Sequence, residues 1–464
     1  MKYENGKVTE LKIAYIGGGS RGWAWGLMSD LALCDKISGT VYLYDIDKQA
    51  AYDNEKIGNS ISKIDSNYGN FKYVAADTYE LALTNADFVV ISILPGTFDE
   101  MESDVHTPEK YGIYQPVGDT TGIGGVFRAL RALPMFFEFA EKIKEFCPKA
   151  FVINYTNPMA LCVAALYKAF PEIKCFGCCH EVFHTQDFLC RIVANELGIE
   201  KPKRNDIKVN IVGTNHFTWL TKAYYNDIDL FPIYESFCKK QARKNEDDSN
   251  QDVICNGGGV FTDGQRVKMD LFLKFGYIAA AGDRHLVEFC PPNWYLKDPA
   301  TVAAWKYALT SVKWRKEELR GRLARKDRLL SGEEEMKIVL TGEEGVNQIC
   351  ALLGLNDFIT NVNLPNYGQI PNLPLGAIVE TNARFCAGGI TPVFAGNVPT
   401  TIKPLVDRNV DVQRMILDAC WERDLDKAFI AFITDTQNTL TLHESRELFD
   451  EMVKNTKEYL KEFF

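Results

Sequence analysis

A glycine-rich loop near the N-terminus, IGGGSRG at residues 16–22, leaves this chain few possible folds. Gly17, Gly19 and Gly22 have the G-x-G-x-x-G spacing of a dinucleotide-binding loop and follow a short apolar run. A backbone without side chains can approach a pyrophosphate closely, and the N-terminus of the following helix attracts its charge. The loop therefore predicts a strand, a tight turn and a helix in succession, as in a nucleotide-binding α/β sheet.

Strand-like and helix-like segments alternate from this loop onward. Six apolar runs are separated by longer stretches with helical spacing, and these runs are 12–18, 41–46, 71–76, 87–94, 150–155 and 174–179. This order is typical of βαβ units, in which helices connect parallel strands. We expect an α/β protein whose N-terminal part is a Rossmann-type, doubly wound parallel sheet.

The pattern changes near residue 200, around Gly198 and Pro202. Beyond this point strands mix with long helices, which we expect at 405–424 and 440–462. A chain of 464 residues is long enough for two domains. We predict a Rossmann NAD-binding domain over 1–200 and an α+β domain for substrate binding and oligomerisation over 201–464.

The charge and composition disfavour several classes of protein. The formal net charge of −10 argues against nucleic acid as a partner, because phosphate binding needs clustered Lys and Arg. The densest basic stretch, 320–328, is expected to be the solvated face of a helix. No run of about 18 uncharged apolar residues predicts a membrane span, and residues 1–10 lack the apolar core of a secretion signal. We expect a cytoplasmic protein with no membrane partner and with buried thiols in place of a disulfide framework.

An acidic residue supports the interpretation of the glycine loop. Asp45 ends the second predicted strand, 23 positions after Gly22, which is close to the spacing of a carboxylate that binds the adenosine ribose. Its charge favours NAD over NADP, whose additional phosphate it would repel. We expect Gly17, Gly19, Ser20, Gly22 and Asp45 to bind NAD; the alternative is an incidental glycine-rich turn.

Three polar clusters follow later strands or lie just beyond them: NYTNPM at 154–159, CCHEVFH at 178–184 and GTNHF at 213–217. The chain has six histidines; three lie in the last two clusters, and His285 lies in GDRHLVEF at 282–289. Because open α/β sheets bind ligands at the carboxyl ends of their strands, these clusters are candidates for the site. Asn157 could hold a ligand hydroxyl or cap the helix that Pro158 can start.

A metal site is expected from Cys179 and His216, a thiolate and an imidazole that are far apart in the sequence. No CxxC-type spacing indicates a closed zinc site, and two protein ligands leave positions open for a substrate, as in a catalytic site. The alternative for Cys179 is a buried thiol that binds nothing. We expect Cys178 to be such a thiol and His184 to pack near the site.

Taken in order, the motifs resemble those of glycoside hydrolase family 4, whose members are NAD-dependent. The resemblance rests on IGGGS, LYDID, GDTTGIGGVFRALR at 118–131, NYTNPM, CCHEV, GTNHF and GDRHLVEF. It implies a fold of the lactate and malate dehydrogenase superfamily and assembly as a homodimer or homotetramer. It also implies NAD and Mn²⁺, or another divalent metal, as cofactors, although thiolate and imidazole ligands prefer zinc.

The resemblance implies a hydrolysis in which NAD is regenerated in every cycle. NAD takes hydride from C3 of the sugar, a base removes the acidified proton at C2, and the metal stabilises the enediolate. The leaving group departs from C1 by elimination, water adds, and hydride returns to C3. The same architecture leaves two alternatives open: a 2-hydroxy-acid dehydrogenase, which needs a catalytic His–Asp pair and no metal, and, more remotely, a nucleotide-binding sensor without catalysis.

The same resemblance assigns roles to individual residues. Cys179 and His216 match the metal ligands, and Asn157 matches a contact to the sugar. Asp283 is expected to be the base or its partner, and His180 the acid. Further contacts to the substrate or nicotinamide are expected from Asp119, Asn215 and Glu181. Arg128 and Arg284 either orient anionic or hydroxyl groups or form structural ion pairs.

The tetrad Cys179-His180-Glu181-Val182 resembles that of α-galacturonidases, which implies short α-1,4-linked galacturonides as substrates. Glu181 would repel the carboxylate of a uronate by about 4 kcal/mol at a separation of about 4 Å and an effective dielectric of about 20. It must therefore point away, be paired or contact hydroxyls, while a cation such as Arg284 receives that carboxylate. If Glu181 merely caps its helix, the alternative substrates are α-glucosides, α-galactosides or α-glucuronides of the same family.

Overall fold

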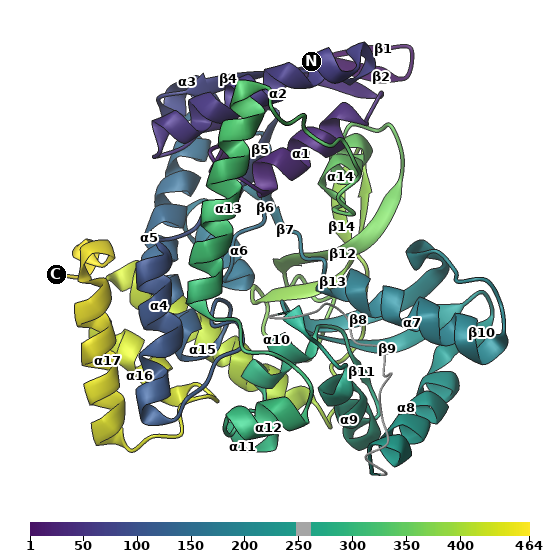
Figure 1. Cartoon of the computed structure of the whole chain (residues 1–464), viewed down its shortest axis with the longest axis vertical. Coiled ribbons are helices and arrows are strands. Elements are labelled where there is room, and N and C mark those ends of the chain that lie inside the picture. Colours follow the sequence, from purple (N-terminus) through teal and green to yellow (C-terminus); the bar gives the residue numbers. More distant parts are fainter. Residues whose placement is uncertain (247–260) are drawn as a thin grey trace.

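The computed structural model describes residues 1–246 and 261–464. In this part of the chain, ten strands form one large sheet in the order β14-β13-β12-β7-β6-β5-β2-β3-β4, with β1 paired to β2 (Figure 1). Its strands are β1 Lys2–Glu4, β2 Lys7–Ile16, β3 Ile37–Tyr44, β4 Phe71–Ala76, β5 Phe88–Ile91, β6 Phe151–Asn154, β7 Lys174–Gly177, β12 Phe358–Pro365, β13 Ile378–Cys386 and β14 Gly389–Pro392. A smaller antiparallel sheet consists of β8 Ile207–Thr214, β9 Phe217–Tyr225, β10 Ile228–Asp229 and β11 Ile278–Ala279.

The centre of the large sheet is parallel. Strands β2 to β7 run in one direction, and all the strands expected from the sequence are present, although β3 begins at Ile37, before the expected residue 41. The chain places β3 and β4 on one side of β2 and then β5, β6 and β7 on the other. This reversal between β2 and β5 is where doubly wound sheets bind ligands. The predicted α/β fold with a Rossmann-type sheet is confirmed.

Helices cover both faces of the large sheet (Figure 1). Their bounds are α1 Trp23–Ala32, α2 Lys48–Ile64, α3 Tyr79–Leu83, α4 Phe98–His106, α5 Gly122–Phe146, α6 Met159–Ala169, α7 Glu181–Leu197, α8 Leu230–Glu246, α9 Arg266–Phe275, α10 Asp283–Phe289, α11 Pro292–Tyr295, α12 Pro299–Ala304, α13 Val312–Ser331, α14 Gly345–Leu352, α15 Lys403–Glu422, α16 Leu425–Thr434 and α17 Leu442–Thr456. Alternate residues of β2 enter separate cores: Ala14 and Ile16 pack with α3, α5 and α6, whereas Ile13 and Tyr15 pack with α1, α2 and α14. The two-residue period of a strand accounts for this separation.

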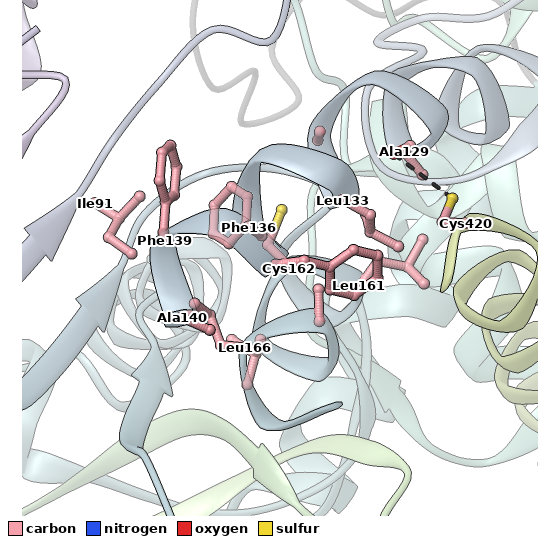
Figure 2. Packing of buried hydrophobic residues seen from close by; sticks show 14 of the residues in the cluster. Ile91, Ala129, Leu133, Phe136, Phe139, Ala140, Leu161, Cys162, Leu166 and Cys420 are labelled. Atoms are coloured by element: carbon pink, nitrogen blue, oxygen red, sulfur yellow. Dashed lines mark hydrogen bonds between the residues drawn. The ribbon is translucent and has the colours of Figure 1, made fainter. Parts of the chain in front are cut away.

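The core on the α5 side joins segments that are far apart in the sequence. Figure 2 shows Ile91 of β5, Phe136 of α5 and Leu161 of α6 in one buried cluster. Cys420 of α15 belongs to the same core, with its sulfur 4.0 Å from the carbonyl oxygen of Ala129. Because α16 and α17 also contribute to this core, C-terminal helices stabilise the N-terminal sheet.

Strands from the C-terminal half also extend the sheet. β12 joins the edge of β7 through the pair Asn363–Gly177 and continues antiparallel into β13 and β14. Residues on both sides of position 200 thus share one sheet, and the division into domains 1–200 and 201–464 stays a prediction. The helix expected at 405–424 is α15, whereas the one expected at 440–462 is α-helical only to Thr456 and ends in short 3-10 turns.

The surface of α13 agrees with the interpretation of the basic stretch 320–328. Arg325 and Arg328 both form ion pairs with Glu334, and in this helix burial is confined to Val312. None of the helices in the described ranges is long and apolar enough to cross a membrane. The cysteines that the structure describes are free thiols.

Candidate active site

The glycine loop lies at the reversal point of the sheet. The N–H groups of Gly17 and Gly18 donate to the carbonyl of Tyr44 at 2.9 Å each, which fixes the loop against the end of β3. Gly17 has a φ of +92°, and a Cβ there would collide with the carbonyl oxygen of Ser92 after β5, so glycine is required. Gly22 then begins α1 without a capping side chain, which leaves N–H groups of the first turn directed at the predicted cofactor site.

Asp45 fixes the same loop from the end of β3. Its carboxylate accepts hydrogen bonds from the N–H groups of Gly19, at 2.8 Å, and Asp47, at 2.9 Å. Burial raises the pKa of Asp45, while these N–H groups oppose that shift. Its contact with a ribose stays a prediction. Ser20 accepts a hydrogen bond from the N–H of Trp23 through its hydroxyl, at 3.2 Å, and thereby orders the first turn of α1.

A cavity of about 310 Å³ opens beside this loop. It extends from Tyr15 of β2 and Trp23 of α1 to Tyr155 and Glu343, and Arg322 of α13 also lines it. The ring of Trp23 lies 5.2 Å from that of Tyr155 and 6.4 Å from that of His180. The glycine loop and the histidine cluster therefore belong to one continuous site.

Four histidines gather around the carboxylate of Glu181. The Nε2 of His285 and the Nδ1 of His184 lie 3.7 and 3.6 Å from its Oε1, while its Oε2 accepts a hydrogen bond from the N–H of Gly282 at 2.7 Å. Burial alone would raise the pKa of Glu181, but the imidazoles, including those of His216 and His180, hold it well below its ordinary value. The carboxylate of Glu181 thus faces histidine side chains and the N–H of Gly282.

The segments that carry Cys179 and His216 meet behind this carboxylate. The side chain of Asn215 hydrogen-bonds the thiol of Cys179, and His216 follows in the tight turn between β8 and β9. His216 has a φ of +62°, a left-handed conformation that costs a non-glycine residue about 1–3 kcal/mol and that clusters at functional sites. Burial raises the pKa of the Cys179 thiol well above its ordinary value and lowers the pKa of His216 to about 3. The imidazole of His216 is thus neutral, as a metal ligand must be.

A hydrogen-bonded chain sets which nitrogen of His216 is free. The hydroxyl of Thr120 donates to the Oδ1 of Asp119 at 2.8 Å and lies 3.0 Å from the Nδ1 of His216. Burial would raise the pKa of Asp119, but Arg128, Arg315, His216 and His285 lower it overall, so that this carboxylate is ionised and can only accept. With its hydrogen given to Asp119, Thr120 must accept the Nδ1 proton of His216. The lone pair of His216 is therefore on Nε2, where it can bind a metal.

The site also retains buried polar atoms without partners. Among the described residues, the Oδ1 atoms of Asn157 and Asn215 and the Nδ1 of His285 have no hydrogen-bond partner. Buried polar atoms are normally satisfied, so such a cluster points to a ligand with hydroxyl groups or positive charge. A second group of possible metal ligands consists of His180, Glu181 and His184, whose ligand atoms lie within 4.8 Å of one another. These observations fit a divalent metal and a sugar at this place.

His180 occupies the mouth of the site, at the N-terminus of α7. Its Nδ1 lies 2.9 Å from the Oε1 of Glu343, and its ring meets that of His184 edge-on. Burial would lower the pKa of His180, but Glu343, Glu181 and Glu380 raise it above the ordinary value. A half-exposed imidazole with a raised pKa can hold and donate a proton near neutral pH.

Asp283 lies deeper than expected for a base. It is fully buried, and its two oxygens accept the N–H groups of Val267 and Lys268 at 3.0 and 2.9 Å at the start of α9. Its own N–H donates to the Oδ2 of Asp263 at 2.9 Å. Asp263 is near Glu181, and burial raises its pKa. Asp263 stands outside the motifs of the sequence, and the structure places it between Asp283 and Glu181.

The arginines of the motifs are largely engaged by the protein. Arg128 of α5 donates through Nε to the carbonyl of Asn157 at 3.0 Å and so positions that residue. Arg284 donates to the carbonyls of Ala308, at 3.2 Å, and Pro116, at 3.1 Å, and to the hydroxyl of Thr310. These bonds tie Arg284 to two loops.

Glu288 of α10 anchors one of those loops. Its Oε1 accepts the N–H groups of Val117 and Gly118 at 2.8 Å each, just before Asp119. Burial, together with the nearby Asp119 carboxylate, raises the pKa of Glu288 to about 8. At neutral pH this carboxyl group is therefore mostly protonated. Glu288 lies in GDRHLVEF, but its role depends on contacts with a loop that is distant in the sequence, and Glu343 and Glu380 stand in no recognisable polar pattern.

Comparison with known proteins agrees with this geometry. Two family models match the chain: family 4 glycosyl hydrolase over residues 12–195 and the family 4 glycosyl hydrolase C-terminal domain over residues 211–437. The chain is 56% identical over 461 residues to an alpha-galacturonidase of Thermoanaerobacterium saccharolyticum, an alignment that covers 99% of this chain and 98% of the relative. The crystal structure of the glucosidase LplD of Bacillus subtilis is similar with a TM-score of 0.90 at 47% identity, covering 96% of this chain and 100% of that chain. A 6-phospho-alpha-glucosidase from gut microorganisms, solved in complex with NAD and Mn²⁺, shares the fold with a TM-score of 0.77 at 20% identity, covering 97% and 99% of the two chains.

The raised pKa of Glu288 predicts a pH-dependent stability. Between about pH 4.5 and pH 8 the unfolded chain ionises this group while the folded chain keeps it protonated, so the folded state loses up to about 4 kcal/mol as the pH rises. Glu288→Gln keeps an acceptor for both N–H groups and removes this loss. We expect the urea midpoint of E288Q to exceed that of the wild type increasingly from pH 5 to pH 8. Glu145→Gln, on the exposed surface, should show no such trend, and a constant difference for E288Q would contradict the assignment.

Proposed function

Because the chain belongs to family 4 of the glycosyl hydrolases, we propose that it hydrolyses α-galacturonides, with short α-1,4-linked galacturonides as the expected substrates. The observation that carries this proposal is the 56% identity to an alpha-galacturonidase along the whole chain. The contacts of Glu181 support it, since its two oxygens face imidazoles and the N–H of Gly282 inside the protein. Neutral α-glucosides, α-galactosides and α-glucuronides are the alternatives within the family, and the family match argues against a 2-hydroxy-acid dehydrogenase.

NAD is the cofactor that we place at the glycine loop, because family 4 glycosidases depend on it. Gly17, Gly19, Ser20 and Gly22 form the turn that would hold the pyrophosphate, and Asp45 lies where the ribose is expected. Cys179 and the Nε2 of His216 would hold Mn²⁺ or another divalent cation. When bound, NAD accepts and returns the hydride of C3, and the metal polarises the sugar oxygens at C2 and C3.

The protein's own groups would then move the protons. Asp263 is our candidate for the base that takes the C2 proton, and Asp283 is its partner, because the N–H of Asp283 holds the Asp263 carboxylate. His180, with its raised pKa, would protonate the leaving oxygen at C1. The unpartnered amide oxygens of Asn157 and Asn215 would accept sugar hydroxyls. Assembly as a homodimer or homotetramer stays a prediction.

A substrate panel tests the activity. We expect rapid release of galacturonate from digalacturonate in the presence of NAD, Mn²⁺ and a thiol reductant, and little release from maltose, melibiose or a glucuronide. Omission of NAD or of the metal should abolish turnover. Cleavage of maltose or melibiose with digalacturonate untouched would refute the substrate and leave the family assignment intact.

The tautomer of His216 gives a sharper test of the metal site. Thr120→Val removes the hydroxyl that holds the Nδ1 proton, and loss of such a partner typically weakens metal binding by about 10- to 100-fold. We expect this loss in Mn²⁺ binding measured by calorimetry, whereas Cys179→Ser should bind no measurable metal and still bind NAD. Thr121→Val is the matched control, because the side chain of Thr121 makes no capping bond to α5. Unchanged Mn²⁺ affinity in Thr120→Val would contradict the hydrogen-bonded chain.

Exchange with solvent tests the proton abstraction. Turnover in heavy water should place deuterium at C2 of the released sugar, since the base returns a solvent-derived hydrogen. Asp263→Asn should abolish both hydrolysis and deuterium uptake without changing NAD affinity, as measured by fluorescence titration. A product that carries its original C2 hydrogen would argue for direct displacement at C1 instead.

A further inference from the structure

The carboxylate of a uronate needs a cationic partner in the site, and the motifs suggested Arg284 for this role. The structure shows that Nε and one terminal nitrogen of Arg284 already bind the carbonyls of Ala308 and Pro116 and the hydroxyl of Thr310. We infer that Arg315, near the beginning of α13, binds the C6 carboxylate of the substrate. This inference rests on the proposed function and names a specificity-determining residue for it.

Contacts around the first turn of α13 place Arg315 beside the site. Ser311 begins the helix and accepts the N–H of Arg315 at 3.4 Å, while the preceding Thr310 donates its N–H to Pro116 at 3.2 Å. This turn is thereby fixed to the loop that leads into Asp119. The positive charges of Arg128 and then Arg315 contribute most to lowering the pKa of Asp119. Burial, and after it the charge of Arg315, lowers the pKa of Arg284. Arg315 therefore lies among Asp119, Arg128 and Arg284.

An aromatic contact holds the helix turn from the other side. The ring of Trp314 meets that of Phe261 edge-on at 4.8 Å, and the guanidinium of Arg284 lies 5.2 Å from the centre of the Phe261 ring. Phe261 thus contacts both Trp314 and Arg284, which links the helix turn that carries Arg315 to Arg284.

Arg315 differs from Arg128 and Arg284 in having a buried Nε that no acceptor among the described residues binds. In the described ranges its Nε is buried and has no hydrogen-bond partner, whereas the Nε of Arg128 donates to Asn157 and that of Arg284 to Ala308. A buried N–H group without a partner is costly. A carboxylate that accepts from Nε and a terminal nitrogen of the same guanidinium would satisfy it in a bidentate arrangement.

The charges around Arg315 leave room for one more anion. The guanidinium groups of Arg128 and Arg315 lie near the ionised carboxylate of Asp119, and that of Arg284 lies near Arg315. The adjacent carboxyl group of Glu288 is mostly protonated at neutral pH and does not compensate them. A substrate carboxylate would be an anionic partner for Arg315, whereas the neutral hydroxymethyl group of a galactoside would not.

Two substrates that differ only at C6 provide the test: p-nitrophenyl α-galacturonide and p-nitrophenyl α-galactoside. We expect Arg315→Gln to lower kcat/KM for the galacturonide by roughly 10- to 150-fold, mostly through KM, as for loss of a charged hydrogen bond. Turnover of the galactoside should change by less than about threefold, and Arg315→Lys should be intermediate because lysine keeps the charge but not the planar fork. Arg320→Gln, an exposed arginine on the same helix, is the matched control.

Binding of free galacturonate by calorimetry adds a readout that does not require turnover, and we expect the same selective loss in Arg315→Gln. An equal loss for the galacturonide and the galactoside would overturn the inference, because Arg315 would then support the fold or Asp119. Selective loss in Arg284→Gln with none in Arg315→Gln would also overturn it. Tighter binding of galactose 6-phosphate than of galacturonate would assign the arginines to a phosphate. Wild-type enzyme that cleaves only neutral glycosides would instead refute the proposed function itself.

Discussion

The candidate metal site depends on the edge of the parallel sheet where β12 pairs with β7. In the pair Asn363–Gly177, Gly177 lies two residues before Cys179, so the C-terminal strands meet the end of β7 next to this cysteine. From β12, the amide of Asn361 donates to the carbonyl of Cys179 at 3.2 Å and to Glu380 of β13 at 2.6 Å. Glu380 in turn accepts from Asn215 at 3.2 Å, which precedes His216. One strand pairing thus sets the positions of residues from three distant segments.

Burial and neighbouring charge divide the carboxyl groups of the site into two protonation classes. Glu181 and Asp119 are buried or half-buried, yet imidazoles and guanidinium groups keep their pKa values low and the groups ionised. Glu288 and Glu380 receive neutral donors, so burial dominates and raises their pKa values to about 8 and about 7. Environment, and not residue type, therefore decides which carboxyl group bears charge near the substrate.

Local patterns in the sequence predicted the features that depend on local physics. The strands β2 to β7 were found because apolar runs alternate with helical spacing, and the loop at Gly17 because its spacing reflects a backbone requirement. The extension by β12, β13 and β14 was not predicted, since antiparallel pairing across about 180 residues leaves no local period. The helix predicted at 440–462 is too long, because the chain turns from α-helical to 3-10 geometry after Thr456.

The candidate site shows the same limit at the level of side chains. Cys179, His216 and Glu181 stand in compact motifs at strand ends, and the structure brings these segments together. Arg284 stands in such a motif as well, but its donors bind backbone carbonyls, a use that no sequence pattern reveals. Arg315 lies in the ordinary polar stretch of α13 and enters the site because that helix begins beside the loop of Pro116. Position in a motif therefore predicts proximity to a site, whereas the binding role of a side chain depends on which of its hydrogen bonds the fold leaves free.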